Sequence, residues 1–179
     1  QATRMSDAFF EHPILNSPYA YPARHWELEP ETHQPTGHLI ETRRKAEFIT
    51  PIPKPKKQKA AQYHFVFDEG KGLSSAQQQY DPTSTINELR QRVDQWRTIP
   101  NPANWGVTPE TQRLLQHWRH HEFGAFRPFF CQIEAVETAI WLTEVAPHVA
   151  AGKGFLEHLT RANHDANPEL MRLALKLAT

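Results

Sequence analysis

The pattern of hydrophobic and polar positions changes character near residue 81. Before that point, apolar and aromatic residues are interrupted every few positions by proline, whereas after it they recur at helical spacing. Proline lacks a backbone N–H and is excluded from helix interiors. We therefore predict extended, turn-rich structure for residues 1–37 and helices from residue 81 onward.

Short β-type segments are predicted in the proline-rich part. Leu39 and Ile40 begin one candidate strand, and residues 63–67 form a second, which ends at a glycine-containing turn. Residues 48–53 have β-type side chains but are closed by prolines, which limits them to an edge strand.

Aromatic residues make the first 37 residues more apolar than a linker needs to be. A fully buried ring of this kind contributes roughly 1.5–3 kcal/mol, so we expect this arm to dock on its own protein. Stacking of Tyr21, Arg24 and Trp26 on nucleic-acid bases is the alternative, and we favour docking. The rings are Phe9, Phe10, Tyr19, Tyr21 and Trp26.

Two helices are predicted between residues 81 and 126. The first has a capping box in which Thr85 and Glu88 satisfy free backbone donors reciprocally. The second has Thr108 as its cap and Pro109 at its first position, where the missing N–H costs nothing. The apolar stripe of the first helix is Ile86, Leu89, Val93 and Trp96, and that of the second is Leu114, Leu115 and Trp118.

The last fifty residues predict two more helices and a strand. A helix follows Pro128, and another covers residues 152–162 with Phe155, Leu156 and Leu159 facing inward. Residues 163–168 have the composition of a loop. Residues 170–178 are almost continuously apolar, which is typical of a strand buried on both faces of a parallel sheet.

A pair of histidines on the second predicted helix has the spacing of metal ligands. His117 and His121 are four residues apart and would share a helix face, which is a spacing found for zinc ligands. Two imidazoles do not complete a zinc site, however, and Glu122 lies elsewhere on the helical wheel. We favour a polar helix end.

Charge and cysteine content limit the binding partners, the disulfides and the cellular compartment that we expect for this protein. Twenty basic and twenty acidic residues give a net charge of zero, so only a local patch can attract nucleic acid. The one basic run is a lysine cluster, formed by Lys54, Lys56, Lys57 and Lys59. A single cysteine, Cys131, excludes an intrachain disulfide and fits a reducing compartment. No apolar run is long enough to span a membrane, and we expect a cytoplasmic protein.

Both ends of the final segment resemble motifs of superfamily 2 helicases. Arg-Pro-aromatic at residues 127–129, followed by Cys-Gln-Ile-Glu-Ala-Val at residues 131–136, resembles the glutamine motif R-P-Y-Q-x-E-A, with two extra residues between Arg127 and Gln132. Residues 173–179 resemble the strand that leads into A-T-G-x-G-K-T. The nearest resemblance is to the helicase subunit of type III restriction endonucleases and its DEAD/DEAH-box relatives. Residues 10–16 and 21–26 also look like the N-terminal arm of one branch of that group.

The resemblance implies an α+β protein. Its parts would be a proline-rich arm with small β elements (residues 1–80), a helical segment (81–126), and the start of a RecA-like ATPase domain (127–179) that ends at its first strand. By resemblance, Gln132 would recognise adenine, with Arg127, Phe129 and Thr179 beside the nucleotide. The phosphate loop would lie beyond Thr179, so we expect the 179 residues alone to bind no cofactor and to have no activity.

For the whole protein, the resemblance implies an ATP- and Mg²⁺-dependent hydrolase that moves on double-stranded DNA, with endonuclease activity and a methyltransferase as a possible partner subunit. Two alternatives stay open. One is a non-enzymatic nucleic-acid-binding module that uses the lysine cluster and the arginines of residues 90–97. The other is a module that docks a partner subunit.

Overall fold

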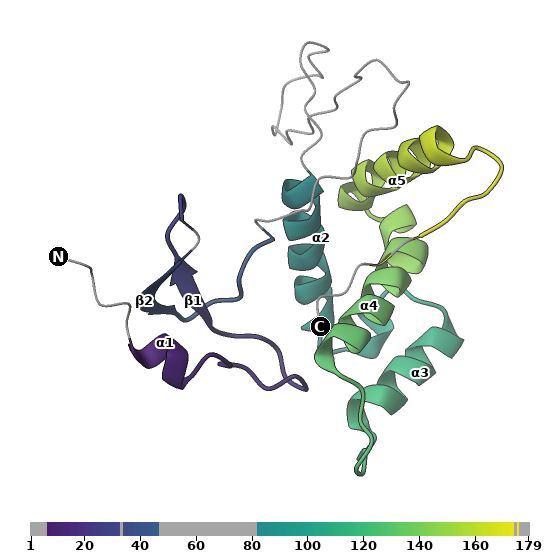
Figure 1. The fold of residues 1–179 in the computed structure, drawn as a ribbon. Coiled ribbons are helices and arrows are strands. Elements are labelled where there is room, and N and C mark those ends of the chain that lie inside the picture. Colours follow the sequence, from purple (N-terminus) through teal and green to yellow (C-terminus); the bar gives the residue numbers. More distant parts are fainter. Residues whose placement is uncertain (1–6, 33, 47–81, 174, 176–179) are drawn as a thin grey trace. The chain divides into compact units, whose positions relative to one another are not determined.

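The computed structural model describes residues 7–32, 34–46, 82–173 and 175, and these form a mixed α+β structure (Figure 1). The chain divides into two compact units. Unit 1 comprises residues 1–45, 120–137 and 174–179, and unit 2 comprises residues 46–119 and 138–173. The predicted strand at residues 63–67, the lysine cluster and Thr179 lie outside the described residues.

Unit 1 contains a two-stranded antiparallel sheet. Strand β1 (His25–Leu28) pairs with β2 (Pro35–Ile40), and the register shifts between Trp26 and Leu28. The strand predicted at Leu39 and Ile40 is therefore present, but it begins earlier, at Pro35. Strand β1 lies in a region that we predicted to be only extended and turn-rich.

Trp26 anchors this sheet to the short helix α1 (Asp7–Glu11), which the sequence did not predict. The indole is 9% exposed, and its N–H donates to the carbonyl of His12 at 3.2 Å. The ring of Phe9 meets it edge-on, with a centroid separation of 6.0 Å. Trp26 and Phe9 therefore pack against each other within the arm itself.

Unit 2 opens with helices α2 (Pro82–Arg97) and α3 (Pro109–His120), with the short 3₁₀ turn η1 (Pro102–Asn104) between them. The cap of α3 is as predicted: the Thr108 hydroxyl accepts from the Thr111 N–H at 3.3 Å. The capping box at Thr85 is wrong, because α2 begins three residues earlier and includes Thr85 in its second turn. Pro82 at the first helical position is the start signal, since a helix N-terminus does not need its missing N–H.

Helix α4 (Phe130–Ile140) begins in unit 1 and ends in unit 2, after the predicted start at Pro128. It continues into a π-helical turn, η2 (Trp141–Val145), and two 3₁₀ turns, η3 (Ala146–His148) and η4 (Ala150–Gly152). The chain then forms α5 (Lys153–Ala166). This last helix was predicted, but it extends four residues into the segment that we expected to be a loop.

Helices α2, α3 and α5 and the turns after α4 enclose one hydrophobic core in unit 2. The ring of Phe155 meets that of Trp141 edge-on at 5.8 Å. Leu115 is the member from α3, whereas Leu114 and Trp118 are 49% and 42% exposed, so two of the three residues predicted for its core side face outward. The core residues are Val93, Trp96, Trp105, Leu115, Trp141, Leu142, Val145, Ala146 and Phe155.

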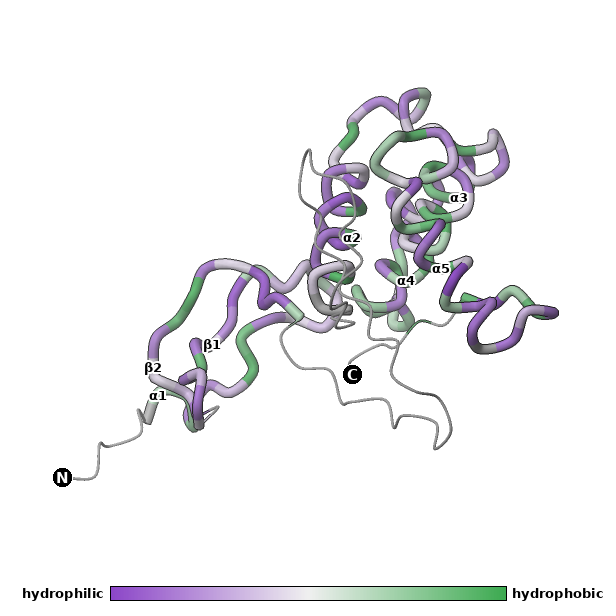
Figure 2. Tube along the Cα trace, turned by 90° about the horizontal axis from the view of Figure 1, so that it is seen from above, coloured by the Kyte–Doolittle hydropathy of each residue, from purple (hydrophilic) through white to green (hydrophobic). Residues whose placement is uncertain are grey.

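Helix α2 is amphipathic, so we expect its apolar side to be buried against this core. Hydrophilic and hydrophobic positions are interspersed along the helix (Figure 2), as in an amphipathic surface helix. Trp96 and Trp105 both belong to the core, and their indole N–H groups are hydrogen-bonded. The Trp96 indole N–H donates to the Trp105 carbonyl, and the Trp105 indole N–H donates to the Ile99 carbonyl, both at 2.8 Å. The Arg119 guanidinium lies 4.4 Å from the Trp105 ring centroid.

The strand predicted at residues 170–178 is not formed by the described residues of that segment. Residues 170–173 and 175 are neither helix nor strand, and Leu170, Met171 and Leu173 are 50%, 65% and 40% exposed. The backbone of Arg172 is instead bound by the Asn163 side chain, through bonds of 2.7 and 2.8 Å. An apolar run becomes a buried strand only beside partner strands, and the described sheet contains only β1 and β2.

Within the described residues, no helix has both the length and the apolar character that crossing a membrane requires.

Candidate functional site

The first turn of α4 is the site that the sequence singled out, and its backbone donors are satisfied in two ways. The Gln132 side-chain oxygen accepts from the Phe129 N–H at 2.8 Å, which makes this glutamine a cap of its own helix. The Phe130 N–H donates to the carbonyl of Pro18 at 2.9 Å, so the N-terminal arm supplies the second acceptor. A helix start leaves such N–H groups without intrahelical partners, which explains why both acceptors gather here.

Two aromatic rings and one arginine lie beside this turn. The rings of Tyr19 and Phe129 are stacked, with centroids 5.2 Å apart and planes 25° from parallel. The Arg127 guanidinium lies 4.0 Å from the centroid of the Tyr19 ring. Tyr19 and Phe129 are 37% and 44% exposed, so part of each ring is accessible to a further planar group.

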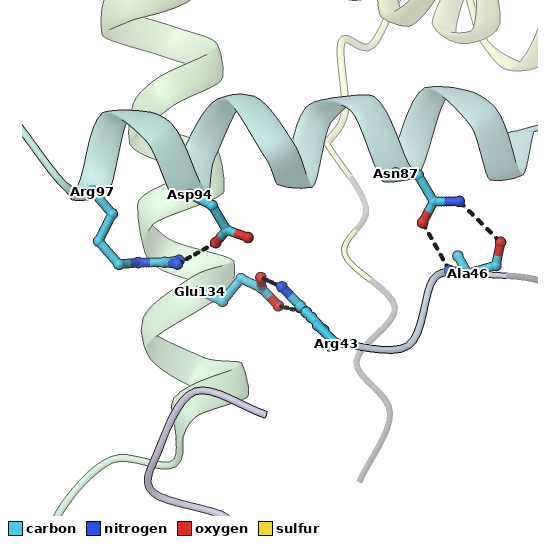
Figure 3. Close-up of polar contacts among 6 residues, drawn as sticks. All are labelled: Arg43, Ala46, Asn87, Asp94, Arg97 and Glu134. Carbon is cyan, nitrogen blue, oxygen red and sulfur yellow. Dashed lines mark hydrogen bonds and ion pairs between the residues drawn. The ribbon is translucent and has the colours of Figure 1, made fainter. Parts of the chain in front are cut away.

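An ion pair joins the arm to the second turn of the same helix (Figure 3). Both terminal nitrogens of Arg43 bind the carboxylate of Glu134, at 2.5 and 2.7 Å, and both side chains are largely buried, at 16% and 14% exposure. The Arg43 guanidinium also lies 5.6 Å from the Tyr21 ring and 5.8 Å from the Phe130 ring. Those two rings meet edge-on at 5.4 Å.

Three of the four predicted nucleotide-site residues are therefore neighbours at one helix start. Arg127 and Phe129 precede α4, Gln132 is in its first turn, and the three are joined through the Tyr19 ring and the Phe129 amide. Gln132 is exposed, and its amide nitrogen has two donors while its oxygen has a second lone pair beyond the bond to Phe129. An exposed amide beside a partly open ring can bind a flat heterocycle through its edge and its face.

In the alternative use of the arm, base stacking by Tyr21, Arg24 and Trp26, the structure leaves Tyr21 and Arg24 exposed but not Trp26. Trp26 is buried against α1 and has no open ring face to offer. Arg24 is bound through its guanidinium to the Leu15 carbonyl at 3.4 Å.

The histidines predicted to share a face of α3 are not gathered into a metal site. Helix α3 ends at His120, so His121 lies beyond it, where its ring meets Phe123 edge-on at 4.7 Å. His117 lines a shallow surface pocket together with Glu110, Arg113 and Leu114. Among the residues that the structure describes, no three His, Cys, Asp or Glu side chains are placed to hold a metal ion.

The arginines of α2 are weaker candidates for phosphate contacts than their number suggested. Arg92 lies 3.5 Å from Glu88 and Arg97 binds Asp94, in both cases on the same helix. These carboxylates offset part of the positive charge on which the nucleic-acid-binding alternative depends.

Glu144, in the π-helical turn, stabilises the start of α3. Its two carboxylate oxygens accept from the Thr108 N–H and from the Thr111 hydroxyl, each at 2.6 Å. Burial raises the pKa of Glu144, but these hydrogen bonds outweigh it, so the pKa lies below its ordinary value. A negative charge at a helix N-terminus is also favourable to the helix dipole.

The contacts of the arm with α4 were beyond sequence reasoning. Arg43 and Glu134 are separated by 91 residues. Glu134 occupies the glutamate position of the segment that resembles the glutamine motif, but Arg43 belongs to no motif, and the short segment around Pro18 has no periodicity. Only the excess of aromatic residues in the arm indicated that it would dock.

Comparison of the chain with protein-family models, with curated proteins and with solved structures finds no match.

Proposed function

We propose that this chain is the N-terminal part of an ATP-dependent DNA translocase of the type III restriction helicase kind, and that the start of α4 receives the adenine of ATP. The observation that carries the proposal is the meeting of Gln132, Phe129 and Arg127 at one helix start, beside the exposed ring of Tyr19. These are residues of the segment that resembles the glutamine motif.

The chemistry of adenine fits this arrangement. Its edge presents an amino donor beside a ring-nitrogen acceptor, and a glutamine amide offers the complementary acceptor and donor. A ring face such as that of Phe129 or Tyr19 supplies a stacking surface of the kind that binds bases without regard to sequence. The phosphates and Mg²⁺ would be bound by a loop that follows Thr179, and double-stranded DNA would be the track. We also propose that the whole protein contains the RecA-like sheet of such a motor.

Substitution of Gln132 tests this function in the protein carried through the proposed phosphate loop. Loss of a paired amide costs about 1–3 kcal/mol, so Gln132→Ala should weaken ATP binding roughly 5- to 150-fold. GTP carries a carbonyl where adenine has its amino group, so it should bind poorly to the unchanged protein and lose little in the variant.

Gln91→Ala is the matched control, because Gln91 is also an exposed glutamine within a helix. It should leave the affinities for both nucleotides unchanged. Equal losses of ATP and GTP affinity in Gln132→Ala would show that the residue supports only the fold. A reading frame that continues past Thr179 without Gly-x-Gly-Lys followed by Thr or Ser would refute the motor assignment.

A further inference from the structure

The N-terminal arm reaches the start of α4 through three kinds of contact. Pro18 accepts a hydrogen bond from the Phe130 N–H, Tyr21 packs edge-on against the Phe130 ring, and Arg43 binds Glu134 with both of its terminal nitrogens. Each contact falls within the first five residues of the helix. Gln132 lies between the two α4 residues that the arm holds, Phe130 and Glu134.

The ion pair is the most directional of these contacts. A bidentate arginine–carboxylate pair fixes both position and orientation, because its two hydrogen bonds are parallel and in one plane. With both side chains about 85% shielded, removal of either partner would leave a charge with little access to water. The arginine also touches both aromatic rings, so one residue links all parts of the contact.

We propose that Arg43 is a positioning residue: its ion pair with Glu134 fixes the first turn of α4 and thereby holds the Gln132 amide in its capping orientation. This inference rests on the proposed function for its consequence in nucleotide binding. The positioning itself is a property of the 179-residue chain. Arg43 acts through Phe130 and Glu134, whose side chains it contacts.

Hydrogen exchange on the 179-residue chain measures the positioning without any nucleotide. The Phe130 and Phe129 amides report the bonds to Pro18 and Gln132. Loss of a charged hydrogen-bonded pair should lower their protection about 10- to 100-fold in Arg43→Ala. Arg43→Lys should recover only part of this protection, since an ammonium cannot form the two parallel bonds.

The reversed pair separates the ion pair from other effects of the substitution. Arg43→Glu alone should reduce the protection at least as much as Arg43→Ala, and adding Glu134→Arg should restore most of it. Arg92→Ala is the control, because it removes an arginine from an exposed pair 3.5 Å from its partner, and surface pairs contribute little. Unchanged Phe129 and Phe130 protection in Arg43→Ala would overturn the proposal.

Nucleotide affinity in the protein carried through the phosphate loop then tests the consequence. Arg43→Ala should weaken ATP binding, and the reversed pair should recover it. If the protection falls while ATP binding is unchanged, and Gln132→Ala still weakens binding, Arg43 orders the turn but its expected consequence for nucleotide binding is refuted, and the proposed function stands. If neither variant affects ATP binding, the proposed function fails, and hydrogen exchange alone decides whether Arg43 orders the turn.

Discussion

Each of the two units of this chain is stabilised internally by a different kind of contact. Unit 2 encloses nine buried hydrophobic residues in one cluster, from helices and turns that follow one another closely along the chain. In the described part of unit 1, Trp26 is the only buried hydrophobic side chain, and the arm is joined to α4 by an ion pair, ring contacts and backbone hydrogen bonds. Apolar burial stabilises unit 2, whereas directional polar and aromatic contacts dominate in unit 1.

Because of this difference, the two units should respond differently to substitution. Apolar burial is not directional and its contribution is spread over many side chains, so unit 2 should lose stability mainly through changes of volume. A unit that depends on a few directional contacts should lose its order when one of them is removed. The substitutions below test this contrast, from the largest expected effect to the smallest.

Gly152→Ala should be the most damaging single-methyl change in unit 2. A Cβ atom at this position would lie 2.0 Å from the Ala146 carbonyl oxygen and 2.5 Å from its carbonyl carbon. The backbone of η3 or η4 would have to move, at a cost of about 2–4 kcal/mol of unfolding free energy. Chemical denaturation followed by circular dichroism would measure this loss.

Gly106→Ala is the control within the same unit. Nothing lies within 4 Å of its added Cβ, but its φ of +69° is unfavourable for alanine, so the cost should be about 1–2 kcal/mol. A smaller loss in Gly152→Ala than in Gly106→Ala would contradict the close packing of η4 on η3.

Trp26→Phe should loosen unit 1 and leave unit 2 unchanged. The substitution removes the hydrogen bond to the His12 carbonyl and part of the buried ring, at a cost of about 1–2 kcal/mol. Hydrogen exchange should show faster exchange in β1 and β2, with α2 and α5 unaffected. Equal loosening of α2 and α5 would show that the two units do not respond separately.

Glu144→Gln should destabilise unit 2 by roughly 0.5–1.5 kcal/mol at neutral pH, since the amide can replace only one of the two accepting oxygens. The pKa of Glu144 is lower in the folded state, so the unfolded chain binds the proton more readily. The stabilisation is therefore complete above the ordinary value of 4.5 and is lost as the pH falls through the folded-state pKa.

Denaturation curves of Glu144→Gln and of the unchanged chain, measured between pH 7 and pH 3, would check this dependence. The gap between the two proteins should narrow in the acidic range. A constant gap would mean that the charge of Glu144 contributes nothing to the start of α3.

Helices were predictable here because their signals are local. The cap at Thr108 with Pro109, the start of α4 after Pro128 and the inward position of Phe155 were each readable from a few neighbouring residues. Helix α1 and strand β1 were missed, because five and four residues among prolines are too few to show a period.

The geometry of two further segments was not predictable, for a common reason. The segment after Ile140, for which no element was predicted, forms a π-helical turn followed by 3₁₀ turns that the hydrophobic pattern does not encode. The apolar run after Glu169 was predicted as a strand, yet its described residues form none. In both cases the pattern gives the need for burial but not the geometry, which depends on partners distant in the sequence.

The candidate site was predictable only in part for the same reason. Gln132, Phe129 and Arg127 were singled out by the resemblance of one segment to the glutamine motif. Tyr19 and Arg43 come from the arm and become neighbours of Phe129 and Glu134 only through folding. The predicted contribution of Thr179 and of the lysine cluster stays a prediction, since those residues lie outside the described part of the chain.

The buried indoles of unit 2 allow the unfolding of this protein to be followed by tryptophan fluorescence. Trp96, Trp105 and Trp141 are 4%, 3% and 3% exposed, whereas Trp118 is 42% exposed. Indoles away from water emit at shorter wavelength than hydrated ones, so melting of unit 2 should appear as a red shift on top of a constant contribution from Trp118. Of the five tryptophans in the sequence, Trp26 is the one in unit 1. The difference in emission between the unchanged chain and Trp26→Phe would therefore isolate the signal of the arm from that of the helical core.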